Sequence, residues 1–98
     1  MEITKNIQDN TATLFLAGRL DTMTAPELER ELQDILPNAK DLVLDFEQLE
    51  YISSAGLRVL LSAQKIMSKQ GQMRITHVNE TIMEIFEVTG FVDILTIE

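Results

Sequence analysis

The sequence predicts a single α/β domain with a mixed, mainly parallel sheet. Ninety-eight residues suffice for one domain, here residues 1–98. Strand-like apolar runs alternate with helix-like segments through most of the chain, and helical connections are typical of parallel strands. A polar turn between the first two strand-like runs adds an antiparallel hairpin. The predicted order is therefore β-β-α-β-α-β-α-β.

Eight segments carry the predicted elements. The strands are expected at 1–7, 11–18, 41–46, 72–78 and 92–97, and the helices at 24–36, 57–67 and 79–90. The first helix is expected to begin at a capping Thr24, with Glu27 completing a capping box and Pro26 in the first turn. Asn79 is the expected cap of the last helix, and Gly90 its expected end.

The helix predicted over 57–67 is mostly buried. Apolar residues cover more than half of its circumference, so that Arg58, Ser62, Lys65 and Lys69 share a narrow polar stripe. Residues 51–79 contain no acidic residue and carry a charge of +4, against −12 for the remainder of the chain. This stripe is either an ordinary solvated helix edge or part of a partner surface.

Composition narrows the classes of function. A net charge of −8 disfavours direct binding of nucleic acid, because phosphates would be repelled. The chain has no cysteine, no apolar run of the roughly 20 residues that cross a bilayer, and no signal-peptide pattern at its start. We therefore expect a soluble, cytoplasmic domain without membrane insertion.

Residues for catalysis are scarce. His77 is the single histidine and falls inside a predicted strand, which favours a structural role. Asp41, Asp45 and Glu47 are spaced too loosely for a magnesium site and are interpreted as solvated charges at a strand end. Four separate glycines exclude a phosphate-binding loop. The expectation is a protein without catalytic residues, cofactor or metal.

Small residues fill the junction between the strand that starts at 41 and the helix that follows. Ser53, Ser54, Ala55 and Gly56 stand there, and two of them carry hydroxyls. One interpretation is a serine that caps the helix by accepting a backbone N–H. The other is a phosphate-bearing serine at the positive end of a helix. Local sequence alone favours the cap.

Three stretches together resemble the STAS domains of anti-sigma factor antagonists (anti-anti-sigma factors). These stretches are "LAGRLDTMTAPEL", "LVLDFEQLEYISSAGLRVLL" and "EVTGFVDIL", in the order and spacing of that family. The resemblance spans essentially the whole chain. It implies a sheet with helices packed largely on one face, and a regulatory protein that switches partners.

The resemblance also implies the partners and the site. The unphosphorylated antagonist would bind an anti-sigma factor that is a serine kinase of the histidine-kinase-like ATPase fold. Phosphorylation would release it, and a PP2C-type phosphatase would reset it. The family's acceptor serine maps to Ser54, where the preceding residue is Ser53 in place of a frequent Asp, and the following residue is Ala55 in place of a frequent Ser.

The expected partner-binding residues are Asp21, Ser53, Ser54, Ala55, Gly56 and Arg58. Asp21 matches an acid of the family on a neighbouring loop, and a role as a strand-end cap is equally compatible with its position. Arg58 stands four residues after Ser54, so the two side chains are neighbours on the helix surface. The alternative function is a soluble STAS-type regulatory subunit of a transport or secretion system.

Overall fold

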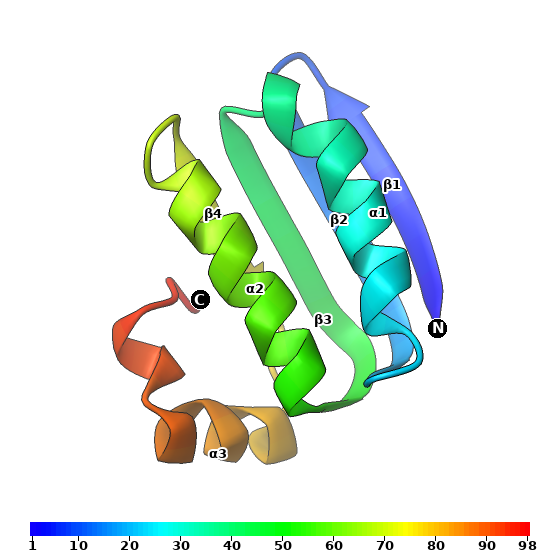
Figure 1. Cartoon of the computed structure of the whole chain (residues 1–98), viewed down its shortest axis with the longest axis vertical. Coiled ribbons are helices and arrows are strands. Elements are labelled where there is room, and N and C mark those ends of the chain that lie inside the picture. Colours follow the sequence, from blue (N-terminus) through cyan, green and yellow to red (C-terminus); the bar gives the residue numbers. More distant parts are fainter.

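The sheet and helices form two layers in a computed structural model that describes residues 1–98. The sheet has four strands in the order β1-β2-β3-β4. Helices α1 and α2 lie side by side over one face of the sheet, and α3 lies across one end (Figure 1). The elements are β1 (Glu2–Gln8), β2 (Thr11–Leu20), α1 (Ala25–Ile35), η1 (Leu36–Asn38), β3 (Asp41–Ile52), α2 (Ser54–Met67), β4 (Gln72–Thr76), α3 (Glu80–Thr89) and η2 (Phe91–Asp93).

The predicted mixed sheet is confirmed. β1 and β2 form the antiparallel hairpin, whereas β2–β3 and β3–β4 are parallel pairs. Each parallel pair is joined through a helix, because a strand can return in the same direction only by a crossover. β3 is six residues longer than expected at its C-terminal end, since two register shifts against β2 let it continue as a strand to Ile52.

The predicted last strand, 92–97, is wrong. The chain forms the 3₁₀ turn η2 there, and only Ile97 makes a β-bridge, to Ile75. The spacing of the apolar residues explains the difference. Phe91 and Leu95 are four positions apart and both turn inward, which is a helical spacing and not the two-residue period of a strand.

The core lies between the helices and one face of the sheet. Buried residues alternate along β2 (Ala12, Leu14, Leu16) and meet the inner side of the helices, as at Leu28 of α1 and Leu60 of α2. No polar or charged residue is buried. The other face of the sheet carries no helix, so it offers half-buried and exposed side chains to the surroundings.

The predicted ends of α3 are confirmed. The Asn79 side chain accepts the Ile82 amide at 2.8 Å, and Gly90 adopts a left-handed conformation with φ of 80° after the last turn. No helix of the structure combines the length and the apolar character needed to cross a bilayer.

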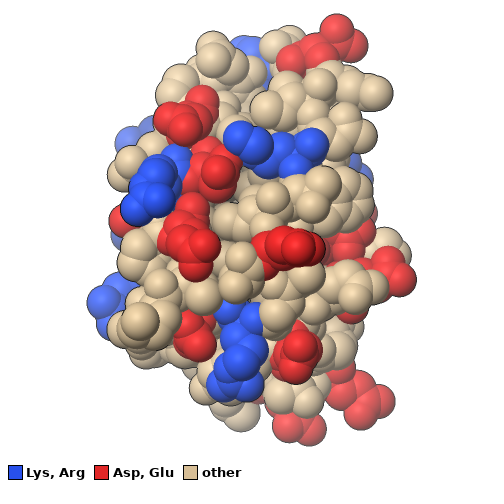
Figure 2. All heavy atoms as spheres, turned by 90° about the vertical axis from the view of Figure 1, so that its right-hand side faces the viewer, with Lys and Arg blue, Asp and Glu red and all other residues tan.

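Charges of both signs lie close together on the side of the molecule next to β1. Figure 2 shows this side, with acidic and basic side chains interspersed. Here Lys5 of β1 pairs with Glu31 of α1 at 2.8 Å. The hydrogen bond and the charge of Glu31 raise the pKa of Lys5 above the usual value for lysine.

Candidate functional site

The serine junction is held in place by the ends of two strands. Ser53 adopts an extended conformation directly after β3, with φ of −103° and ψ of 178°. Its amide donates to the Leu20 carbonyl at the end of β2, and its carbonyl accepts the Leu57 amide from the first turn of α2, both at 2.9 Å. The backbone of the junction is therefore fixed on the strand side and on the helix side.

The two serine hydroxyls lie in different environments. Ser54 is the first residue of α2 and is exposed. The Ser53 Oγ atom is buried and has no hydrogen-bond partner. Neither hydroxyl accepts an amide of α2, so the serine cap favoured by local sequence is not formed. Ser53 occupies the cap position, but its oxygen is buried and does not pair with these amides.

The first turn of α2 consequently offers unpaired amides. The N–H groups of Ser54, Ala55 and Gly56 precede the first intrahelical bond, which the Leu57 amide makes. The aligned peptide dipoles add partial positive charge at this end. An anionic group on Ser54 would therefore meet a favourable electrostatic environment.

Gly56 supports the junction from inside. It is buried, and a Cβ atom at this position would lie 2.7 Å from Leu20 Cγ and 2.8 Å from Ile52 Cγ1. Only glycine lets the helix come this close to the strand ends. The structure thus gives Gly56 a buried, supporting position beneath the junction, and its predicted role in partner binding stays a prediction.

Asp21 organises the loop between β2 and α1. Its Oδ1 atom accepts the amides of Met23 at 3.0 Å and Thr24 at 3.1 Å, and Arg19 Nε lies 3.9 Å from Oδ2. Desolvation raises the pKa of Asp21, but the hydrogen bonds from Thr24 and Met23 and the charge of Arg19 outweigh it, so the pKa lies below the usual aspartate value. The strand-end cap considered for Asp21 is therefore present.

The capping box predicted for α1 is wrong. The Thr24 hydroxyl accepts the Asp21 amide at 2.8 Å and donates to the Arg19 carbonyl at 2.7 Å, so it does not cap the helix. Asp21 supplies the acceptor for the loop amides instead. The Thr24 side chain is thereby committed to closing the loop against the end of β2.

A shallow depression of about 270 Å³ separates the first halves of α1 and α2. Thr22, Glu29, Ala55, Arg58 and Ser62 contribute to its lining. The depression therefore joins the loop after β2 to the start of α2. Of the predicted residues, Ala55 and Arg58 line this surface, and the Asp21 loop borders it.

The basic stripe of α2 is free of ion pairs. Arg74, the fourth basic residue of the acid-free stretch 51–79, pairs with Glu98 at 3.4 Å. Arg58, Lys65 and Lys69 are exposed and form no ion pair. A cation thus stands one helical turn beyond Ser54 with no acid of its own chain engaging it.

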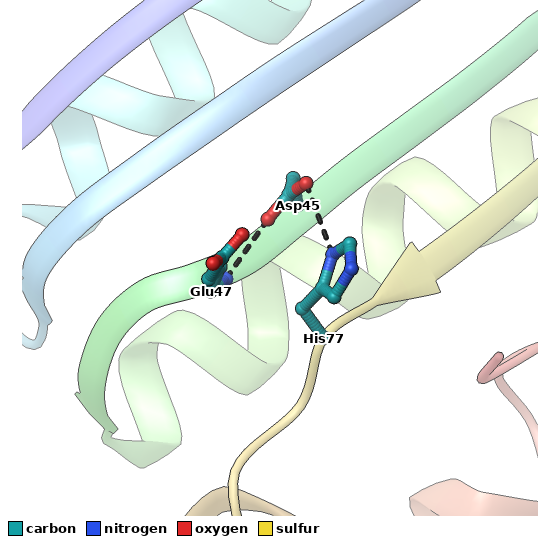
Figure 3. Close-up of side chains that lie close together, drawn as sticks. All are labelled: Asp45, Glu47 and His77. Carbon is teal, nitrogen blue, oxygen red and sulfur yellow. Dashed lines mark hydrogen bonds and ion pairs between the residues drawn. The ribbon is translucent and has the colours of Figure 1, made fainter.

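The structure also places His77, which the sequence assigned a structural role, beside two acids interpreted as solvated charges at a strand end. Asp45, Glu47 and His77 lie close to one another on the sheet face without helices (Figure 3). His77 does not lie inside a strand as predicted, because β4 ends at Thr76. The parallel pairing of β3 with β4, which places Asp45 opposite Thr76, is the signal that could have revealed this proximity.

Comparison with known proteins identifies the family. Residues 3–96 match the family described as "Mlab, STAS domain". BtrV of Bordetella bronchiseptica, a candidate anti-sigma factor antagonist, is 34% identical over 99% of this chain and 85% of its own length. The structure of a candidate anti-sigma factor antagonist from Thermotoga maritima has a TM-score of 0.89 at 21% identity, covering 97% of this chain and 84% of that chain. The phosphorylated form of SpoIIAA, a Bacillus cell fate determinant, has a TM-score of 0.77 at 15% identity, covering 99% and 91%. Because the family match spans nearly the whole chain, this protein belongs to the STAS domain family.

Proposed function

We propose that this protein is an anti-sigma factor antagonist that changes partners when Ser54 is phosphorylated. The single observation that carries the proposal is the exposed Ser54 hydroxyl at the first position of α2, beside unpaired amides. In its unphosphorylated form the protein binds an anti-sigma factor that is itself a serine kinase of the histidine-kinase-like ATPase fold. Phosphorylation ends this complex, and a PP2C-type phosphatase restores the binding form.

The relatives support the type of partner and the type of modification. BtrV carries the description of an anti-sigma factor antagonist over nearly the same length of chain. SpoIIAA, which shares the fold, has been solved in a phosphorylated form. The junction in this chain offers one exposed serine for such a modification, because the Ser53 oxygen is buried.

The physical effect of the phosphate is local. It adds about −1.5 to −2 charges at neutral pH, next to a helix end that favours an anion by about 0.3–1 kcal/mol. Arg58, one turn further along and free of an ion pair, is drawn to that phosphate. The surface presented to the partner thereby becomes more negative, and acidic groups on the kinase are repelled.

The acceptor is tested with the cognate kinase, ATP and peptide mass spectrometry. Wild-type protein and the Ser53→Ala variant should carry phosphate on Ser54, and Ser54→Ala should carry none. The Ser54 hydroxyl makes no hydrogen bond in the structure, so alanine should leave the fold intact. Phosphate on Ser53 or Ser62 with Ser54 unmodified would refute the assignment.

The partner surface is tested with charge reversals at Arg58 in α2 and at Lys69, just beyond the end of this helix. Arg58→Glu should weaken binding to the kinase and slow association, with a larger effect at low salt, because the surface loses a steering cation. Lys69→Glu is the matched control about three helical turns away and should change little. Equal, salt-independent losses from both variants, or no loss from either, would remove Arg58 from the interface.

A further inference from the structure

We propose that Asp45, Glu47 and His77 form a binding site for a divalent first-row transition metal ion of the zinc type. The three residues come from the middle of β3 and from the turn after β4. One ligand atom from each lies within 4.8 Å of the others. Figure 3 shows the His77 ring directed at Asp45, with Glu47 alongside.

The backbone after β4 turns His77 toward this site. Ile75 is buried against the helices, whereas Thr76 lies opposite Asp45 in the parallel pair. A continued strand would point the next side chain back to the helix-covered face, because side chains alternate. His77 instead adopts a left-handed conformation with φ of 58°, which places its Nδ1 atom 3.1 Å from Asp45 Oδ2.

Glu47, the third residue, lies at an irregularity in β3. The register against β2 shifts between Asp45 and Gln48, so β3 carries one extra residue there. The Glu47 amide donates to Asp45 Oδ1 at 2.9 Å. This bond holds the Asp45 carboxylate with its other oxygen toward His77, in the manner of the hydrogen bonds that orient metal ligands.

The ligand set selects the class of ion. An imidazole nitrogen with two carboxylates suits zinc and neighbouring first-row ions, whereas magnesium and calcium prefer oxygen ligands alone. Bonds of about 2.0–2.2 Å to zinc require the three ligand atoms to move closer together. The His77 side chain, 59% exposed, has room to do so, while the Asp45 side chain, 13% exposed, provides the fixed position.

The proposed site is independent of the serine junction. Asp45 lies on the sheet face that α1 and α2 leave uncovered, whereas Ser54 begins the helix packed on the opposite face. Three protein ligands also leave coordination positions for water or for a group from another molecule. Metal binding can therefore be measured without any partner of the antagonist.

The composition of the chain allows zinc binding to be assigned to His77. His77 is the only histidine and there is no cysteine, so the untagged full chain has no other imidazole and no thiolate to bind zinc. Titration with Zn²⁺ alone, followed by calorimetry and by the NMR signals of the His77 ring, should saturate at one equivalent. His77→Asn should weaken binding by about tenfold or more, and asparagine is tolerated at a positive φ.

Two further variants and one control complete the experiment. Asp45→Asn and Glu47→Gln should each weaken Zn²⁺ binding, and asparagine at 45 still offers an oxygen to the Glu47 amide. Glu50→Gln, an exposed acid of the same strand outside the cluster, should bind as the wild type does. No saturable binding up to about 1 mM Zn²⁺, or equal binding by His77→Asn and wild type, would overturn the proposal.

Discussion

Replacing Gly56 by alanine should destabilise the protein although alanine is the better helix former. The added methyl group would lie 2.7 Å from Leu20 Cγ and 2.8 Å from Ile52 Cγ1. Both neighbours are fully buried side chains at the ends of β2 and β3, so they have little room to move. The conflict can be relieved only by shifting the first turn of α2 or the two strand ends.

The expected magnitude follows from two opposing terms. Overpacking of a well-filled core costs about 1–3 kcal/mol. Alanine in a helix recovers up to about 1 kcal/mol relative to glycine, and less in the first turn. The free energy of unfolding should therefore fall by about 1–2 kcal/mol, which lowers the melting temperature of a domain of this size by about 4–16 °C.

Urea unfolding followed by circular dichroism measures this change, with Gly90→Ala as the control. At Gly90 no atom lies within 4 Å of an added Cβ, but φ is 80°, so alanine there meets backbone strain without a steric conflict. Gly56→Ala should also alter the NMR signals of Ser54, because the first turn of α2 shifts. A Gly56→Ala protein as stable as the wild type, or more stable, would refute the argument from close packing.

Three other substitutions test the caps and the loop. Asn79→Ala should lower the free energy of unfolding by about 1–2 kcal/mol in the same urea assay, because the side chain both accepts the Ile82 amide and donates to the Leu49 carbonyl. Asn79→Asp keeps only the bond from the Ile82 amide and should lower the free energy of unfolding by less. Ser53→Ala should leave stability unchanged or raise it by up to about 1 kcal/mol, since the buried hydroxyl has no partner, and a loss above that size would show that this oxygen is paired. For Asp21 the folded-state pKa lies below the unfolded value of about 3.9, so its contribution is complete above that pH and is lost as pH falls through the folded pKa. Acid unfolding should therefore show a stability difference between wild type and Asp21→Asn that is constant near neutrality and shrinks below about pH 4, and a constant difference down to pH 2 would contradict the charge-based account.

The elements with a clear period or a specific end residue could be predicted from the sequence. The hairpin, the three helices and the Asn79 and Gly90 ends of α3 are examples. The last strand was not predictable from apolar content, because the spacing of Phe91 and Leu95 is helical. Local sequence patterns reveal the periodic spacing of apolar residues and the positions of turns. They give a wrong element where an apolar segment forms a turn and not a strand.

The site was only partly accessible to sequence reasoning. A pair of serines close to the start of a helix follows from the sequence, but the helix begins at Ser54 and not at the predicted residue 57, and which serine is buried depends on packing against the strand ends. Thr24 fits a capping box by type and spacing, yet a competing Asp21 carboxylate takes the loop amides. The approach of His77 to Asp45 depends on strand register and on one left-handed residue, neither of which is visible locally.

The hydrogen bond from the Ser53 amide to the Leu20 carbonyl joins two segments that are far apart in the chain. The exposed serine is therefore presented by the folded domain and not by a contiguous sequence motif. A kinase that docks on this surface would recognise the folded arrangement of these segments, which is lost when the chain unfolds. Under the proposed function, a synthetic peptide covering residues 48–62 should consequently be a far poorer phosphate acceptor than the intact domain.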